Sequence, residues 1–134
     1  MKKVKFLMIA LMLSVSGIAN AQTRAQIQAI LEQFCVEHYD KHFAPRQYVE
    51  GTLRVTSVDF DEDNGKIKVK GTHTCRGQHI PFIGRRTYSG REFKAELLPA
   101  NIGIKIRFWR WYAPDTPGQE GYWEGPCEKT IIPE

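Results

Sequence analysis

The chain has 134 residues, with 19 Lys and Arg against 15 Asp and Glu. This length fits one domain and is too short for two. Three of the basic residues precede residue 22, so the remaining 113 residues carry a charge of only +1, and a near-neutral domain without a basic tract is a poor candidate for binding nucleic acid.

Residues 1–21 have the pattern of a secretory signal peptide. Three lysines precede an apolar segment at 6–15, and Ala19 and Ala21 form a small-x-small cleavage motif before Gln22. The apolar segment is too short to span a membrane, and no later segment approaches the necessary length of about 20 residues. We therefore predict a soluble protein without a transmembrane segment, cleaved after Ala21 and located in the periplasm or secreted.

The mature chain begins with a predicted helix from about Arg24 to His42. Thr23 and Gln26 have the spacing of a capping box at its start, and Pro45 follows its end. Residues suited to one buried stripe recur at intervals of three and four: Ile27, Ile30, Leu31, Phe34 and His38.

A hairpin is predicted next. The first strand runs from Thr52 to Phe60, and a bulge near Thr56–Ser57 is needed to bring its apolar residues to one face. An acidic turn at 61–65, which ends in Asn-Gly, leads into a second strand at 66–76. The inward face of this second strand is expected to contain Ile67, Val69, Gly71, His73 and Cys75.

Three further strands are predicted at 79–88, 91–98 and 102–112, with turns at Gly77–Gln78 and Ser89–Gly90. The last strand alternates clearly, and its inward residues are Ile102, Ile104, Ile106 and Phe108. The Pro- and Gly-rich segment from about residue 113 is predicted to be an irregular tail, anchored by Tyr122, Trp123 and Cys127.

One helix followed by hairpin-linked strands is an α+β pattern. We predict a single domain, residues 22–134, with one N-terminal helix packed on a curved antiparallel sheet of about five strands. This element order resembles that of the cystatin-like and NTF2-like folds. The cystatin inhibitory motif Gln-x-Val-x-Gly is absent, so the resemblance implies a fold and no activity.

The three cysteines predict one disulfide and one free thiol in an oxidising compartment. Cys35–Cys127 is our first choice, because it would attach the tail to the helix and close a long loop, which is worth about 3 to 5 kcal/mol in the entropic model. Cys75–Cys127 is the second choice and Cys35–Cys75 the third.

Cysteine and histidine residues also raise the question of a metal site. Cys35, His38 and His42 share one stripe of the predicted helix, and His73 and Cys75 are on the strand face that the helix should cover; these are zinc-ligand residue types. We favour a structural role, with His38 extending the buried stripe and His42 near the helix C-terminus. No local signature of a thiol enzyme and no Cys-x-x-Cys is present. We predict no metal, no cofactor and no catalytic residue.

The outer face of the sheet is the predicted binding surface, because aromatic residues beside cations suit glycans, anionic groups or a protein partner. Its candidate residues are Lys68, Lys70, Lys105, Arg107, Trp109 and Trp111. Two alternatives remain: acidic residues such as Glu96 would neutralise the cations across strands, or Trp123 would cover the tryptophans. A second cluster, Arg85, Arg86 and Arg91, could bind a carboxylate or phosphate or be a solvated hairpin end.

These features predict a small exported binding module without enzymatic activity, acting on a protein or envelope partner; an inhibitor or immunity-type protein is the concrete version. One alternative is a protein that binds or converts a small ligand in a pocket lined by His38, His73 and Tyr39, and a pocket at the two histidines would favour it. Another is a structural subunit of an envelope assembly.

Overall fold

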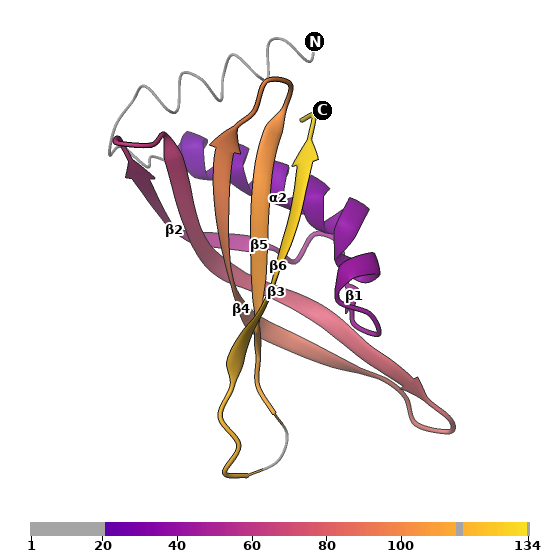
Figure 1. The fold of residues 1–134 in the computed structure, drawn as a ribbon. Helices are drawn as coiled ribbons and strands as arrows, with labels where there is room; N and C mark the ends of the chain where they lie inside the picture. Colours follow the sequence, from indigo (N-terminus) through magenta and orange to yellow (C-terminus); the bar gives the residue numbers. More distant parts are fainter. Residues whose placement is uncertain (1–20, 115–116, 134) are drawn as a thin grey trace.

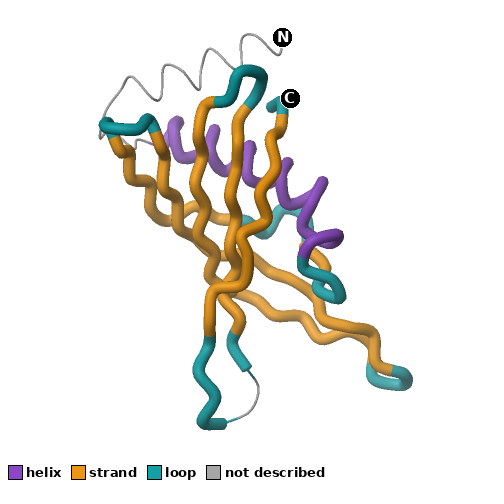
Figure 2. Tube along the Cα trace, in the orientation of Figure 1, coloured by secondary structure: helices purple, strands orange, loops and turns teal. Residues whose placement is uncertain are grey.

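The computed structural model describes residues 21–114 and 117–133, in which one helix lies across a curved antiparallel sheet (Figures 1 and 2). The elements are α2 (Ala21–His42), β1 (Gln47–Tyr48), β2 (Arg54–Asp61), β3 (Lys66–Ile80), β4 (Gly84–Pro99), β5 (Ile104–Tyr112) and β6 (Tyr122–Ile131). The predicted fold class, an α+β fold with an N-terminal helix on an antiparallel sheet, is confirmed.

The strand order in the sheet is β1-β3-β4-β5-β6, and β2 also pairs with β3. Every strand pair is antiparallel. From Arg76, the last residue of β3 that pairs with β1, the strands β3 and β4 continue as a two-stranded projection (Figure 1, lower right). We call this projection, residues 76–88, the β3–β4 arm.

The arm corrects the predicted strand boundaries and turns. The turns expected at Gly77–Gln78 and Ser89–Gly90 are wrong, because β4 is one continuous strand and the chain reverses instead at 81–83. The β3–β4 register shifts between Arg76 and His79, and Gly90 has a φ of +65°. The turn-forming residues therefore accompany irregular strand pairing without reversing the chain, as glycines at β-bulges do.

The first hairpin agrees with the sequence. The β2–β3 register shifts between Val55 and Ser57, where the bulge was expected, and Gly65 closes the turn with a φ of +69°. The helix differs at its start: α2 already includes Ala21, so Thr23 is not its N-cap.

The predicted irregular tail is also wrong, because residues 122–131 form β6 on the free side of β5. Pro126 and the neighbouring Gly125 suggested irregular structure, but proline is tolerated on an edge strand, where its missing N–H breaks no ladder hydrogen bond. Cys127 pairs with Phe108 in this register and is buried.

The predicted signal peptide falls on residues outside the described part of the chain, apart from Ala21. Of the helices that the structure describes, none combines the length and the apolar character needed to cross a bilayer.

Large apolar side chains from α2 and the concave face of the sheet fill the interior. The rings of Phe93 and Phe108 stack with centroids 5.2 Å apart, and Phe34 of α2 packs on Phe108. Gly71 allows this packing, since a Cβ there would lie 2.6 Å from the Phe93 ring and 2.0 Å from the backbone oxygen of Arg54. The space between helix and sheet is a packed core.

The disulfide prediction is wrong: Cys35, Cys75 and Cys127 are all free and buried. Cys35 lies on the buried stripe of α2, and Cys75 and Cys127 occupy inward positions of β3 and β6. All three thiols act as small core side chains, which is the commonest role of a buried free cysteine.

Candidate functional site

The charged residues of the outer sheet face are largely matched across strands. Arg107 Nε donates to Glu128 at 2.5 Å, and Arg107 Nη1 lies 3.6 Å from Glu96. Lys105 Nζ lies 3.6 Å from Glu128. The alternative of internal charge matching is therefore present in the structure, and it leaves fewer unpaired charges for a partner.

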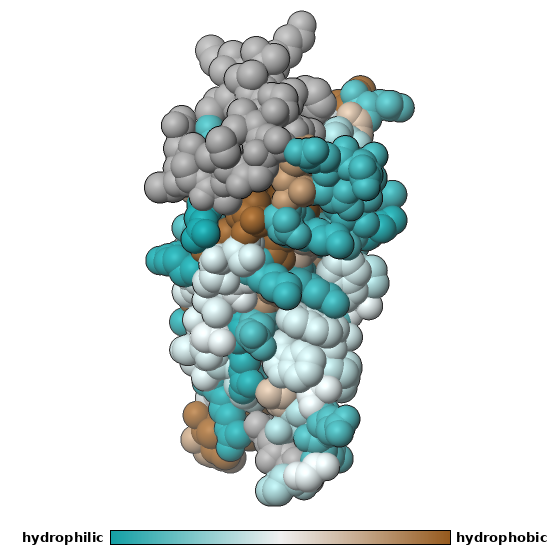
Figure 3. All heavy atoms as spheres, turned by 90° about the vertical axis from the view of Figure 1, so that its left-hand side faces the viewer, coloured by the Kyte–Doolittle hydropathy of each residue, from teal (hydrophilic) through white to brown (hydrophobic). Residues whose placement is uncertain are grey.

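The outer tryptophans are half-covered by their neighbours. Trp123 of β6 meets Trp111 edge to face at 5.2 Å, and Lys94 Nζ lies 4.7 Å from the Trp123 ring and 5.2 Å from the Trp109 ring. Hydrophilic and intermediate residues predominate on the side that Figure 3 shows. Lys68 and Lys70 are exposed beside this group.

The inner face contains a polar group that the sequence analysis missed. Arg110 lies at an inward position of β5, in step with Ile106 and Phe108, and is only 4% exposed. Its Nη1 donates to Glu124 at 2.6 Å and its Nε to the Tyr39 hydroxyl at 3.1 Å. A buried guanidinium thus receives both a counter-ion and a neutral acceptor, as buried charges require.

His73 completes this buried network. Its Nδ1 lies 2.8 Å from the backbone carbonyl of Arg91 and its Nε2 lies 2.8 Å from the Tyr39 hydroxyl. A carbonyl only accepts, so Nδ1 carries the proton of the neutral ring, and Tyr39 donates to Nε2 while accepting from Arg110. Burial lowers the pKa of His73 to about 4, which keeps the ring neutral.

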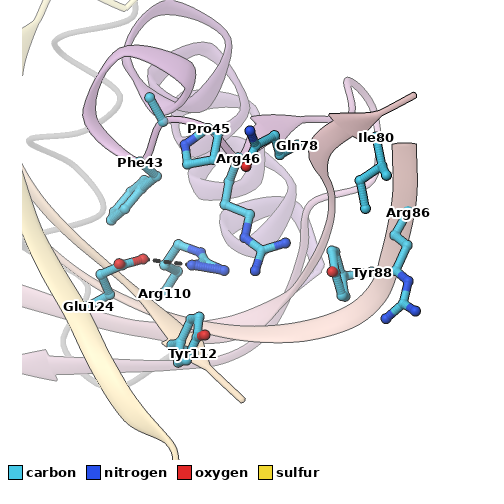
Figure 4. Close-up of a pocket in the computed structure, with 11 residues that line it drawn as sticks. Phe43, Pro45, Arg46, Gln78, Ile80, Arg86, Tyr88, Arg110, Tyr112 and Glu124 are labelled. Atoms are coloured by element: carbon cyan, nitrogen blue, oxygen red, sulfur yellow. Dashed lines mark hydrogen bonds and ion pairs between the residues drawn. The ribbon is translucent and has the colours of Figure 1, made fainter. Parts of the chain in front are cut away.

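A cavity of about 350 Å³ lies against the outer end of this network (Figure 4). Its polar lining contains three arginines, two tyrosines, one glutamine and one glutamate: Arg46, Arg86, Arg110, Tyr88, Tyr112, Gln78 and Glu124. Apolar side chains from the α2–β1 connection and from β3 complete the wall: Phe43, Ala44, Pro45 and Ile80. We call this cavity the arginine–tyrosine pocket.

The pocket has an excess of positive charge. In Figure 4 the guanidinium groups of Arg46 and Arg110 point toward the same space, and Glu124 lies on the far side of Arg110. Arg46 stacks on the Tyr88 ring at 4.4 Å, and none of the carboxylates that the structure describes forms an ion pair with it. Glu124 already pairs with Arg110, so Arg46 is the guanidinium that faces the cavity without a described carboxylate partner, an arrangement suited to binding an anion.

Gly77 makes room for this arrangement. A Cβ at Gly77 would lie 2.8 Å from Arg46 Nη1 and 3.0 Å from Tyr88 Cε2. The missing side chain therefore leaves space for the guanidinium beside β3 and the tyrosine ring.

The predicted arginine cluster is divided by the structure. Arg86 lines the pocket at its outer edge, Arg91 lies 5.0 Å from the Tyr88 ring outside the pocket lining, and Arg85 donates to the backbone oxygen of Gly77 at 3.2 Å. The three arginines therefore lie on or next to the arm, and only Arg86 reaches the cavity.

The predicted inner histidines and the helix cysteine form no site. Neither His38 nor His73 lines the arginine–tyrosine pocket. Burial, with help from Glu32, raises the pKa of the Cys35 thiol well above its usual value, which disfavours the nucleophilic thiolate. Across residues 21–114 and 117–133, no three His, Cys, Asp or Glu side chains are grouped to hold a metal ion.

Comparisons with protein families, curated proteins and solved structures gave no significant match to this chain.

Proposed function

We propose that the protein is a small exported binding module without enzymatic activity, which holds a carboxylate-bearing segment of a protein partner in the arginine–tyrosine pocket. An inhibitor or immunity-type protein is the narrower form of this proposal. The observation that carries it is the Arg46 guanidinium, which has no described carboxylate partner and opens onto a cavity beside tyrosine rings.

The shape of the pocket supports a peptide segment as the occupant. A volume of about 350 Å³ is enough for one large side chain with its neighbouring backbone. Arg46 supplies a planar donor group for a carboxylate, and Phe43, Tyr88 and Tyr112 supply the aromatic walls that anchor partner residues at protein interfaces.

The interior supports a binder more than an enzyme. Tyr39 and His73 are buried and hydrogen-bonded to each other. Burial also raises the pKa of Tyr39 further above its normal range. Neither group is placed to exchange a proton with a bound molecule, as general acid–base catalysis needs.

Site-specific photo-crosslinking in the exported fraction of the source cells tests the proposal. A crosslinking amino acid would replace Ala44, an exposed residue of the pocket wall, and in a control would replace Thr130, an exposed residue of β6. We expect one discrete protein adduct from position 44 that is absent from position 130.

Charge reversal then identifies the pocket. Arg46→Glu should reduce the adduct at least about tenfold, since it places a carboxylate where the partner's carboxylate would bind. Arg24→Glu reverses an exposed charge on α2 and should leave the adduct unchanged. The same diffuse products from positions 44 and 130, or equal loss in both charge variants, would reject the pocket as the binding site.

A further inference from the structure

The tip of the β3–β4 arm exposes a group of apolar side chains to solvent. Phe82 is fully exposed and Ile83 is 73% exposed, with Ile80 beside them at 42%. Phe82 also has a φ of +68°, the only positive value among the described residues other than glycine. A bulky aromatic residue is rare in this conformation, and at a turn tip it places the ring outside the body of the protein.

The arm behind this tip contains arginines and no acidic residue. The sequence from Lys66 to Arg91 contains no Asp or Glu. Its exposed or half-buried arginines at the arm end of the hairpin are Arg76, Arg85, Arg86 and Arg91. The apolar tip is therefore followed at once by guanidinium groups, and the nearest acidic residues along β4 lie beyond Arg91.

We propose that the tip of the β3–β4 arm inserts into the surface of a lipid bilayer that contains anionic headgroups. Phe82 and Ile83 enter the boundary between headgroups and acyl chains, and the arginines behind them bind the lipid phosphates. Apolar residues followed by cations match this boundary in both polarity and charge.

The form of the tip favours a bilayer over a protein pocket. It is a narrow convex turn at the far end of two strands that extend beyond the rest of the sheet (Figures 1 and 2). A bilayer is soft and accepts such a tip at any lateral position. Its negative charge complements the arginines of the arm, which contains no Asp or Glu. This proposal goes beyond binding of a protein partner in the pocket, and it does not depend on that binding.

The chain offers a closely matched control. Ile102, in the turn between β4 and β5, is 73% exposed, as Ile83 is. A general effect of exposed isoleucine would be the same at both positions, whereas insertion of the arm requires only Ile83.

Vesicle co-sedimentation of the full, untruncated protein tests the proposal. The probes are vesicles of mixed phosphatidylglycerol and phosphatidylcholine, and vesicles of phosphatidylcholine alone. We expect binding to the anionic vesicles that weakens with added salt. Phe82→Ser and Ile83→Ser should each lower the partition coefficient about tenfold, because each removes a large apolar side chain from the bilayer. Ile102→Ser should leave it unchanged.

Circular dichroism and denaturation should show all three variants folded, since the substituted side chains are exposed; Ile83→Ser keeps the test decisive if Phe82→Ser changes the turn. No binding to anionic vesicles, or equal effects of Ile83→Ser and Ile102→Ser, would overturn the proposal. A crosslinker at position 82 that captured a single protein, with vesicle binding absent, would assign the tip to that protein instead.

Discussion

Acid sensitivity is the sharpest test of the buried network around His73. Burial lowers the pKa of His73 from 6.5 to about 4, opposed by the hydrogen bond to the Arg91 carbonyl, while the unfolded chain keeps the ordinary value. The unfolded state therefore binds the proton more tightly than the folded state. The stability that neutral His73 contributes is complete above pH 6.5 and is lost as the pH falls toward 4.

This pKa difference corresponds to a loss of about 3 kcal/mol between pH 7 and pH 4. The groups that face the imidazole are Tyr39 on α2, Arg110 on β5 and the Arg91 carbonyl on β4, and neither side chain titrates in this range. Burial lowers the pKa of His38 as well, so the comparison needs a variant in which only position 73 changes.

Urea denaturation of the wild type and of His73→Gln, followed from pH 7 to pH 4, makes that comparison. The glutamine amide can donate and accept hydrogen bonds but does not titrate. We expect the wild type to lose about 3 kcal/mol more than the variant over this interval. Parallel loss in the two proteins, or a His73 pKa near 6.5 by NMR titration, would refute the closed network.

Three further substitutions test the packing. Tyr39→Phe should cost about 3 kcal/mol, because it leaves buried His73 and Arg110 atoms without a partner; the exposed control Tyr122→Phe should change nothing measurable. Gly71→Ala should cost about 3 kcal/mol through its backbone clash, and a wild-type midpoint would contradict this contact. Lys94→Ala should cost about 0.5 to 1 kcal/mol and shift the tryptophan fluorescence, whereas an unchanged spectrum would contradict the cation–π contact.

The helix and the first hairpin could be predicted because their signals are local. Apolar spacing identifies the buried stripe of α2, and the parity change at Thr56–Ser57 identifies the bulge in β2. The strand predicted at 79–88 and the turns on either side of it failed for the opposite reason, while the strand predicted at 91–98 lies within β4. Gly77 and Ser89–Gly90 are turn signals within a few residues, but the pairing of β3 with β4 over more than ten residues outweighs them.

The edge strand β6 shows a similar limit. Its proline and glycines predict irregular structure when neighbours along the chain are considered alone, yet the partner needed to order it is β5, the strongest strand in the sequence. An edge strand tolerates proline, because one of its sides needs no hydrogen-bonding partner. Its sequence can therefore lack the usual signals of a strand.

The pocket was missed because its residues come from separate elements and each is ordinary alone. Arg110 did leave a signal: an arginine at an inward position of the most apolar strand demands a counter-ion and a reason to be there. The partner, Glu124, lies in the segment that was predicted to be irregular. Without β6 in the sheet, the sequence offered no way to bring the two together.

The outer face shows why cations beside aromatic residues are ambiguous until pairing is known. Arg107 lies within β5 and Arg46 directly precedes β1 of the same sheet, but two glutamates on neighbouring strands neutralise Arg107. Arg46 meets a tyrosine ring and an open cavity instead. A surface cation that is already paired with carboxylates of its own chain contributes little to recognition. Arg46, which has no such pair among the described residues, is therefore the better place to expect a carboxylate from a partner.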